Sequence, residues 1–483
     1  MSSVKRNFGW NMLLTVSSYI FPLITFPYVT RVLGAGNLGL ANFAMSFVDY
    51  AVLLSTLGLG YIGCREISQN SGNKEVVQNV FSKLISLHII MTTVILLIYV
   101  SCIFFIPEFS SHKQLYFVGI IKILTNILLI EWLFQSFQDF RYITICSLVL
   151  KTLYVVGVFV FVQSEEDYDA YFYISIAQIS LNGLINWRYS RKYVSFRLQF
   201  RGCLRYFFPV LSMGLNLILF SFYSSFNVLY LGMKSSTEAV GYFTTATKLY
   251  GVLLAVISAY NGVFVPYLNQ LYGQGEMRKF KDTVEKSIPL VCMVSLPIIT
   301  IGILYAQEII LLIAGKGYER AVLPFQIVMI QILLVGLAQI FENQILLSFK
   351  QYKEILICTV SSVLLAILII VAFVPQYAEV ASAYAVAIPH IVEAALLYFF
   401  VKKVIDISFP MIDFLKNLIA CVPIAIVCFS ARALFDNYIM ALLVTSIISV
   451  IYFFAVQYYV LRNDFFINQT KRATLLFCNM FHR

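Results

Sequence analysis

The chain has 483 residues, of which 60% are hydrophobic and only 12% are charged. Soluble domains usually carry about 25% charged residues, so this composition excludes a string of soluble domains and indicates a protein that crosses a membrane many times. The net charge of +10 does not predict nucleic acid as a partner. The basic residues lie in short loops between apolar stretches, where the positive-inside rule accounts for them.

The first two apolar stretches predict a helical hairpin around which the rest of the chain is organised. Residues 8–30 and 38–61 are each long enough to cross a bilayer, which takes about 20 residues, and residues 31–39 between them contain three glycines. Polar side chains follow one helix face of each stretch, namely Asn11, Thr15, Ser18, Pro22 and Thr25 on the first, and Asn42, Ser46, Asp49 and Thr56 on the second. A carboxylate that faces lipid is costly, so Asp49 is expected to face a polar interior. The two polar faces together predict a wet cavity between helices.

Hydropathy predicts an all-α integral membrane protein with about fourteen transmembrane helices. The predicted spans are residues 8–30, 38–61, 84–106, 114–137, 143–163, 171–188, 206–232, 239–265, 287–313, 322–348, 355–374, 380–401, 415–434 and 438–461. An even number places both termini on one side of the membrane, and the excess of Lys and Arg in the loops on that side predicts that it is cytoplasmic. The tail, residues 468–483, is basic and apolar and is expected to lie along the inner surface.

An internal repeat predicts how these helices are grouped. After a basic segment at residues 188–205, the motif around Gly34 and Gly39 recurs around Gly232 and Gly241. The same register matches Asn42, Ser46 and Asp49 with Thr244, Lys248 and Gly251. We therefore expect two six-helix lobes, residues 1–200 and 201–405, related by a pseudo-two-fold axis along the membrane normal. Residues 406–483 form an extra helix pair and a cytoplasmic tail in this interpretation.

Two cations are candidates for binding an anionic substrate. Lys248 lies about ten residues into its span, on a small and polar helix face, at a depth similar to that of Asp49. It either faces the cavity or serves as a structural cation, by extending to the interface or by pairing with Asp49. Arg31 ends the first span, where a guanidinium either binds phosphate or interacts with the helix dipole.

Further polar groups in the spans allow a functional and a structural interpretation. Lys122 shares one face of its span with Asn126, whereas Glu131 lies on the opposite face. These groups and Glu342 in a later span either relay a cation or proton, or form hydrogen bonds between helices. His390 and Glu393, three residues apart after Pro389, either hold a titratable proton or are structural. The sequence contains no catalytic constellation, no nucleotide-binding glycine loop and no metal-ligand spacing among its nine cysteines, so we predict neither an enzyme nor a cofactor or metal site.

Two motifs resemble those of the bacterial polysaccharide repeat-unit flippases, the O-antigen and capsule flippases of the multidrug/oligosaccharidyl-lipid/polysaccharide exporter superfamily. One is the first hairpin, with Pro22, Pro27, Arg31-Val-Leu-Gly and Asn37-Leu-Gly, followed by Gly63-Cys-Arg-Glu-Ile-Ser; the other begins at Glu131-Trp-Leu-Phe-Gln and continues through Arg141-Tyr-Ile-Thr. The resemblance implies a two-lobed exporter in the bacterial inner membrane. Such a protein moves an undecaprenyl-diphosphate-linked oligosaccharide from the cytoplasmic to the periplasmic leaflet by alternating access around a cationic cavity.

Several residues suit such a cargo chemically. Lys248, Arg31 and Lys122 are the cations available for a diphosphate, with Asp49 and Asn42 on the facing polar stripe. Tyr19, Tyr223, Tyr230, Tyr242, Tyr250 and Asn227 can stack on sugars or hydrogen-bond to them. The expected partners are the lipid-linked oligosaccharide, membrane lipids and the polysaccharide polymerase machinery.

Two other functions stay open on the sequence. A cation-coupled exporter of small molecules, of the multidrug type, would need buried carboxylates and would not depend on Lys248. A membrane assembly factor without transport activity would use the polar stripes to bind partner helices.

Overall fold

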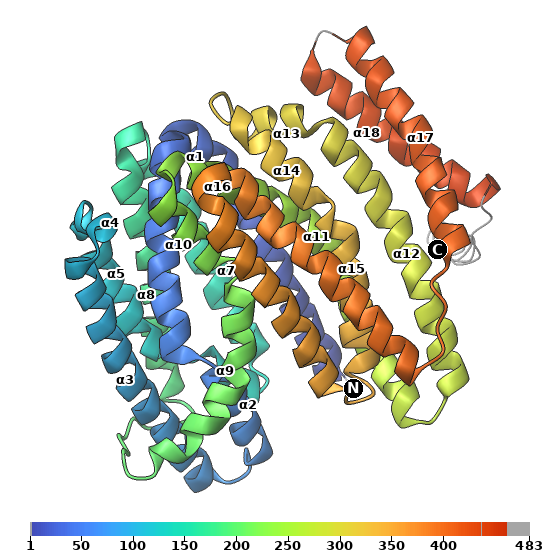
Figure 1. Ribbon diagram of the computed structural model, residues 1–483. Coiled ribbons are helices and arrows are strands. Elements are labelled where there is room, and N and C mark those ends of the chain that lie inside the picture. The colour runs from blue at the N-terminus through green and yellow to red at the C-terminus, as the bar shows by residue number, and fades with distance from the viewer. Residues whose placement is uncertain (1, 436, 461–483) are drawn as a thin grey trace, which may run out of the picture. The chain divides into compact units, whose positions relative to one another are not determined.

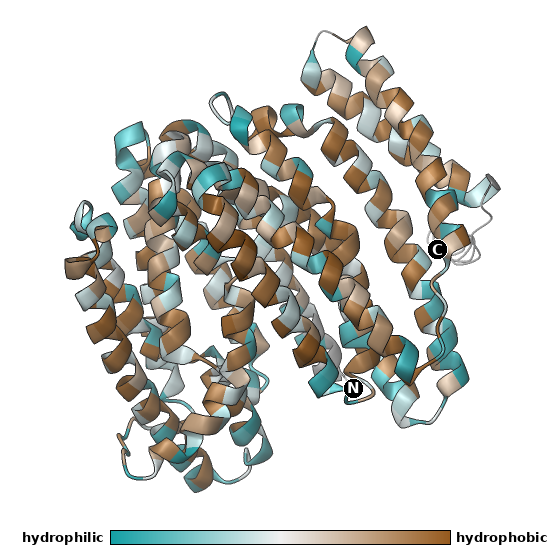
Figure 2. Ribbon diagram, viewed as in Figure 1, coloured by the Kyte–Doolittle hydropathy of each residue, from teal (hydrophilic) through white to brown (hydrophobic). Residues whose placement is uncertain are grey.

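The computed structural model describes residues 2–435 and 437–460, and every regular element within these ranges is helical. Within the described ranges, eleven helical stretches are long and apolar enough to cross a membrane. Apolar residues run along the helices and hydrophilic ones gather at their ends and in the loops (Figure 2). The prediction of an all-α membrane protein is confirmed. The expectation for the tail, residues 468–483, falls outside the described residues.

Figure 1 labels the helices in chain order, except for α6. The first half contains α1 (Ser2–Thr56), α2 (Leu59–Gln69), α3 (Lys74–Phe105), α4 (Pro107–Ser110), α5 (Lys113–Thr125), α6 (Glu131–Ser136), α7 (Phe140–Phe161), α8 (Tyr168–Ser190), α9 (Phe207–Ser221) and α10 (Ser225–Lys234). The second half contains α11 (Thr237–Gly273), α12 (Met277–Leu304), α13 (Ala306–Ile313), α14 (Val322–Met329), α15 (Gln331–Gln339), α16 (Tyr352–Val404), α17 (Met411–Leu434) and α18 (Tyr438–Ala455). Short 3-10 turns occur at Asn126–Leu128, Glu165–Asp167, Cys203–Tyr206 and Glu319–Ala321, and π-helical turns at Ile340–Leu346 and Val456–Val460.

Each of the fourteen predicted spans coincides with helix, although the breaks fall in places that hydropathy does not reveal. Two pairs of predicted spans form the continuous elements α1 and α16, interrupted only by non-helical backbone at Gly34 (φ 69°) and Ala378 (φ 46°). Conversely, four predicted spans are each divided between two or more helical elements, namely 114–137, 206–232, 287–313 and 322–348. Apolar length sets where a span lies, whereas local backbone geometry sets where its helix bends.

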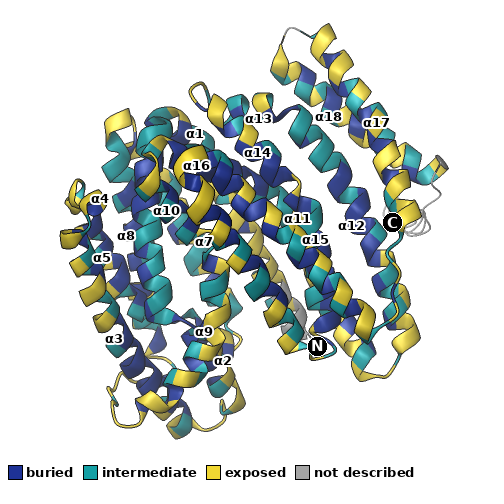
Figure 3. Cartoon of the chain, viewed as in Figure 1, coloured by how far each residue is buried: buried dark blue, intermediate teal, exposed yellow. Residues whose placement is uncertain are grey.

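The chain forms two compact units. The first comprises Met1–Thr245, Ile313–Gly317 and Ala366–Ala385, and the second comprises Ala246–Leu312, Tyr318–Leu365 and Val386–Arg483. These units do not follow the predicted lobes, because α9, α10 and the beginning of α11 pack on α1. The lobe boundaries at residues 200 and 405 stay a prediction. Buried and exposed residues alternate along the same helices, as expected where one side of a helix packs on protein (Figure 3).

In the first unit, α1 turns back on itself (Figure 1). The Thr144 hydroxyl donates to the Trp10 carbonyl at 3.0 Å, and the Ser136 hydroxyl lies 3.4 Å from the Cys64 carbonyl. Residues near the beginning of α1 and just after its end therefore meet the same region of α6 and α7. Gly34, which has a positive φ that favours glycine, lies at the turn and confirms the predicted hairpin.

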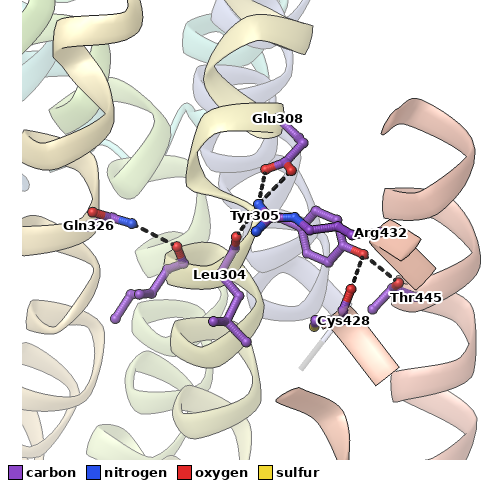
Figure 4. A network of polar contacts seen from close by, with 8 residues as sticks. Leu304, Tyr305, Glu308, Gln326, Cys428, Arg432 and Thr445 are labelled. Carbon is purple, nitrogen blue, oxygen red and sulfur yellow. Dashed lines mark hydrogen bonds and ion pairs between the residues drawn. The ribbon is translucent and has the colours of Figure 1, made fainter. Parts of the chain in front are cut away.

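In the second unit, a polar network joins α12 and α13 to the helix pair α17–α18 (Figure 4). The Tyr305 hydroxyl lies 2.8 Å from the Thr445 hydroxyl and donates to the Cys428 carbonyl at 3.1 Å. Arg432 forms an ion pair with Glu308 at 2.5 Å and also donates to the Leu304 carbonyl at 2.6 Å. These bonds attach the extra helix pair to α12 and α13 through side chains as well as apolar packing.

Candidate functional site

A glycine contact brings α1 close to the beginning of α11 within the first unit. A Cβ atom at Gly39 would lie 1.7 Å from the Thr237 carbonyl oxygen, and one at Gly241 would lie 2.1 Å from the Ala35 carbonyl oxygen. No side chain fits at either position, so only glycine permits the two backbones to approach this closely. Gly39 and Gly241 are also the glycines that the internal repeat matches with each other.

A second pair of matched positions is in contact beside these glycines. The Asn42 side-chain amide donates to the Thr244 hydroxyl at 3.0 Å, and the repeat register matches these two residues. Residues close to a two-fold axis contact their own equivalents, so these contacts fit the predicted pseudo-two-fold relation. Asn42 is thus held by Thr244 in this structure.

The mid-span carboxylate Asp49 forms an ion pair with Lys122 of α5. The Asp49 side chain is 43% exposed, whereas that of Lys122 is only 7% exposed and lies 3.3 Å from the Met45 sulfur. The expectation that Asp49 faces a polar interior stays a prediction. Lys122 lies behind the carboxylate that it neutralises, so a diphosphate would meet Asp49 first. This position favours a structural role for Lys122.

Just beyond the end of α5, the side chains of Asn126 and Glu131 form hydrogen bonds with other helices of the same unit. The Asn126 amide donates to the Thr56 hydroxyl at 2.7 Å and lies 3.5 Å from the Nε2 atom of buried His88. On the other side of the chain, Glu131 accepts a hydrogen bond from the Asn182 amide at 2.9 Å. Both arrangements match the interhelical hydrogen bonds that were the structural interpretation of these residues.

The other candidates in this unit differ in exposure. Arg31 is exposed and packs against Gly315. Gly315 has a positive φ of 89°, and a Cβ atom added to it would lie 3.0 Å from the Cγ atom of Arg31. Asn227 is fully buried, and its amide donates to the Ser382 carbonyl at 3.0 Å. A sugar would reach Asn227 only if α10 and α16 separated there. Tyr223 is half-buried between α9 and α10.

In the second unit, Lys248 is exposed on α11, one turn beyond Thr244. Asp49 already has a cation partner in Lys122, a pairing that the sequence did not predict. The contact between Asp49 and Lys248 stays a prediction. If it forms, the Asp49 carboxylate would be shared by Lys122 and Lys248.

An amide network joins the later part of α11 to α15 and the π-helical turn that follows it. The Gln339 amide donates to the Ser258 hydroxyl at 3.0 Å, and Asn261 bonds to both Gln339 (3.0 Å) and Gln344 (2.9 Å). Gln339 and Gln344 of this network lie on either side of Glu342 in the sequence. Glu342 itself lies in the π-helical turn Ile340–Leu346, a form of helix that is rare and frequent at functional sites.

His390 and Glu393 form the contact that their spacing predicts. The Nδ1 atom of His390 lies 2.8 Å from a carboxylate oxygen of Glu393, and the two side chains are 14% and 5% exposed. The pair is a place where one proton can be shared in a largely buried position. A coupling role stays a prediction.

Sequence reasoning missed a cavity of about 580 Å³ beside the beginning of α7 and the end of α8. Its lining residues are Asp139, Arg141, Tyr142, Ile145, Cys146, Val149, Leu150, Ile185, Tyr189 and Lys192. The rings of Tyr142 and Tyr189 stack 3.6 Å apart. The signal available in the sequence was the cluster of tyrosines and cations at the predicted inner ends of these two spans.

Asp139 organises the mouth of this cavity. It caps α7 through the Tyr142 backbone N–H at 3.4 Å and accepts hydrogen bonds from the Tyr189 and Tyr193 hydroxyls at 2.7 Å each. Burial by itself would raise the pKa of Asp139. The three hydrogen bonds and the charge of Lys192 outweigh burial and hold this pKa below its usual value. Asp139 is therefore ionised at neutral pH.

The helices long and apolar enough to cross a membrane define a polytopic membrane protein, and the comparisons with known proteins identify the family. The sequence matches the family described as polysaccharide biosynthesis protein over residues 4–272, more than half of the chain. The chain therefore belongs to this family.

Two curated relatives have names that describe transport. The "Putative O-antigen transporter" of Escherichia coli (strain K12) is 21% identical over 404 residues, which cover 83% of this chain and 97% of that protein. A protein of the same name from Shigella dysenteriae is 23% identical over 284 residues, covering 58% of this chain and 70% of its own length.

Solved structures share the fold. The structure titled "Lipid II flippase MurJ, inward closed conformation" matches with a TM-score of 0.76 at 14% identity, covering 94% of this chain and 99% of that chain. An outward-facing multidrug resistance MATE family transporter of the MOP superfamily matches with a TM-score of 0.52 at 15% identity, over 83% and 94% of the two chains. The chain therefore shares its fold with these two proteins, and it is a multi-pass membrane protein.

Proposed function

We propose that the protein is a flippase for an undecaprenyl-diphosphate-linked oligosaccharide, which it moves from the cytoplasmic to the periplasmic leaflet of the bacterial inner membrane. The observation that carries the proposal is the membership in the polysaccharide biosynthesis family, combined with a fold shared with a lipid II flippase over 94% of the chain. The names of the two curated relatives agree with it. The polymerase that would use the flipped product is a proposed partner.

Coverage of the extra helix pair supports a lipid-linked cargo. The match to the lipid II flippase leaves 6% of this chain uncovered, about 29 residues, whereas α17 and α18 together span residues 411–455. At least part of the pair is therefore shared with that flippase. The match to the multidrug transporter leaves 17% uncovered, which is more than the pair contains.

In this proposal, the candidate cations bind the diphosphate of the cargo. The diphosphate requires a cation, and Lys248 and Arg31 are the candidates that are exposed, whereas Lys122 is covered and paired with Asp49. Movement between leaflets would proceed by alternating access.

A second candidate function, cation-coupled export of small molecules, draws on the pair His390–Glu393. A buried pair that can share a proton suits coupling to a proton gradient. The two functions differ in what they require. The flippase depends on Lys248, whereas the exporter depends on the buried carboxylates.

Surface polysaccharide in cells tests the proposal. We expect deletion of the gene to abolish surface polysaccharide, the wild-type gene to restore it, and Lys248→Ala to fail while the protein level stays near normal. Lys416→Ala is the matched control, because Lys416 is a lysine with an exposed side chain at the beginning of α17. Normal polysaccharide in the deletion strain would contradict the proposal, and normal polysaccharide with Lys248→Ala would remove Lys248 from the site.

Thiol labelling of single-cysteine variants tests the proposed orientation. Cysteines placed in loops 165–169 and 315–320 should react from the periplasm, and those at Arg191, Lys279 and Lys402 from the cytoplasm. Labelling of both groups from one side would overturn the proposed topology.

A further inference from the structure

We propose that the cavity between the beginning of α7 and the end of α8 binds an anionic phospholipid, with its phosphate at Arg141 and Lys192 and its acyl chains along the apolar walls of the two helices. The cavity of about 580 Å³ lies within the range of about 300–1,000 Å³ that is typical of small-molecule sites. The inference concerns a site separate from the proposed transport site and does not rest on the proposed function.

The walls of the cavity face the membrane. Ile145 and Val149, one turn apart on α7, are 42% and 54% exposed, and Ile185 of α8 is 40% exposed. The exposed apolar stripe continues up α7 through Leu153, Val156 and Val160. In a bilayer, exposed apolar side chains in a spanning helix meet lipid chains, so the occupant of this groove is a lipid.

The mouth of the cavity selects the charge of that lipid. Arg141 is exposed, and among the described residues, 2–435 and 437–460, its side chain makes no hydrogen bond and no ion pair. Lys192, also exposed, lies 5.4 Å from the ring centre of Tyr189 and 5.2 Å from that of Tyr193. Arg141 therefore has its full hydrogen-bonding capacity available for a phosphate, which a guanidinium binds with two parallel hydrogen bonds.

Asp139 is the one anion that lines the cavity, and its position limits its repulsion of a phosphate. Its carboxylate accepts hydrogen bonds from the Tyr189 and Tyr193 hydroxyls and from the Tyr142 backbone N–H, which spread its charge over three donors. With Arg141 and Lys192 the lining keeps a net positive charge. The amino-terminal end of α7 adds a dipole that also favours an anion.

The same end of the first unit is basic beyond the cavity. Arg188 lies in the last turn of α8, and Arg191, Arg197, Arg201 and Arg205 follow in the segment that leaves it. Phe196, Leu198 and Phe200, which alternate with these cations, are about half exposed. A segment of this kind lies at the headgroup level of an anionic leaflet, which places the mouth of the cavity where phospholipid headgroups are.

Native mass spectrometry of the purified full-length protein tests the site. The probes are dioleoyl-phosphatidylglycerol and the neutral lipid dioleoyl-phosphatidylcholine, titrated separately into the same detergent. We expect the wild type to bind phosphatidylglycerol more tightly than phosphatidylcholine. The double variant Arg141→Gln with Lys192→Gln should bind phosphatidylglycerol about thirty-fold more weakly than the wild type. The control variant, Arg197→Gln with Arg201→Gln, removes the same charge from the same end of the unit but not from the cavity, and it should bind like the wild type.

Blocking the groove tests the apolar part independently of charge. Val149→Trp fills the space between the walls and should displace phosphatidylglycerol although both cations remain. Equal loss in the cavity variant and the control variant would overturn the proposal in favour of a diffuse surface charge. Unchanged binding in the cavity variant would overturn it as well. Preferential retention of undecaprenyl diphosphate over phosphatidylglycerol would replace the phospholipid by a substrate-type lipid and thus also refute the assignment.

Discussion

The glycine contact between α1 and α11 allows a sharp test of close packing in the first unit. A methyl group added at Gly39 would lie 1.7 Å from the Thr237 carbonyl oxygen, whereas ordinary contacts begin at 3.4 Å. The two backbones would have to move apart by about 1.7 Å, the difference between these values. Overpacking usually costs about 1–3 kcal/mol, and the nearest atoms are backbone atoms of Thr237 and Gly241, which cannot rotate away, so we expect Gly39→Ala to cost about 3 kcal/mol.

Two matched variants separate this effect from the general effect of replacing glycine in a helix. Gly36→Ala lies one turn earlier in α1 and would meet only the Glu238 side chain at 3.5 Å, and Gly251→Ala in α11 would meet nothing within 4 Å. Alanine is the better helix former by about 1 kcal/mol, so both controls should be neutral or stabilising. Thermal unfolding of the purified variants in one detergent gives the comparison. Equal midpoints for Gly39→Ala and Gly36→Ala would refute the reasoning.

Three further predictions concern charged groups. Arg432→Met should destabilise the helix pair by about 1–3 kcal/mol in thermal unfolding, because Glu308 is left without its partner, and adding Glu308→Gln should recover part of the loss. Asp49→Asn should destabilise more than Lys122→Met, because it leaves the more deeply buried charge unpaired; the reverse order would contradict the burial of the two side chains. The pKa of Asp139 is lowered, so its stabilising contribution is complete above its unfolded value of about 3.9 and is lost as pH falls through the folded value. The stability difference between wild type and Asp139→Asn should therefore be constant from pH 8 to pH 5 and shrink only at lower pH, and a difference that shrinks between pH 8 and pH 5 would contradict the assignment.

The sequence predicted the elements that depend on local rules. A hydrophobic stretch of sufficient length marks a span wherever it occurs, so the fourteen predicted spans coincide with helices. The contact between His390 and Glu393 was equally accessible, because residues three apart on a helix are neighbours regardless of tertiary structure. The repeat matched Gly39 with Gly241 as equivalent positions, whereas their close approach is a finding of the structure.

The partners of the polar residues could not be predicted in the same way. Asp49 pairs with Lys122 because α5 packs beside α1, and nothing in the local sequence states which helices are neighbours. Asn227 was expected to contact sugar, yet its amide bonds to the Ser382 carbonyl, 155 residues away. The cavity at Arg141 and Lys192 also arises from two helix ends that are distant in sequence. Periodicity identifies a polar face, but tertiary packing decides what that face contacts.

The central claim, that the protein flips a lipid-linked diphosphate oligosaccharide, is tested most directly with the purified protein in liposomes. A fluorescent undecaprenyl-diphosphate oligosaccharide is incorporated in both leaflets, and a membrane-impermeant reductant then quenches whatever reaches the outer leaflet. We predict that wild-type protein makes nearly all of the probe accessible, and that Lys248→Ala leaves the inner-leaflet half protected. Quenching by the wild type that stays equal to that of protein-free liposomes, under each ion and proton gradient applied, would contradict the account.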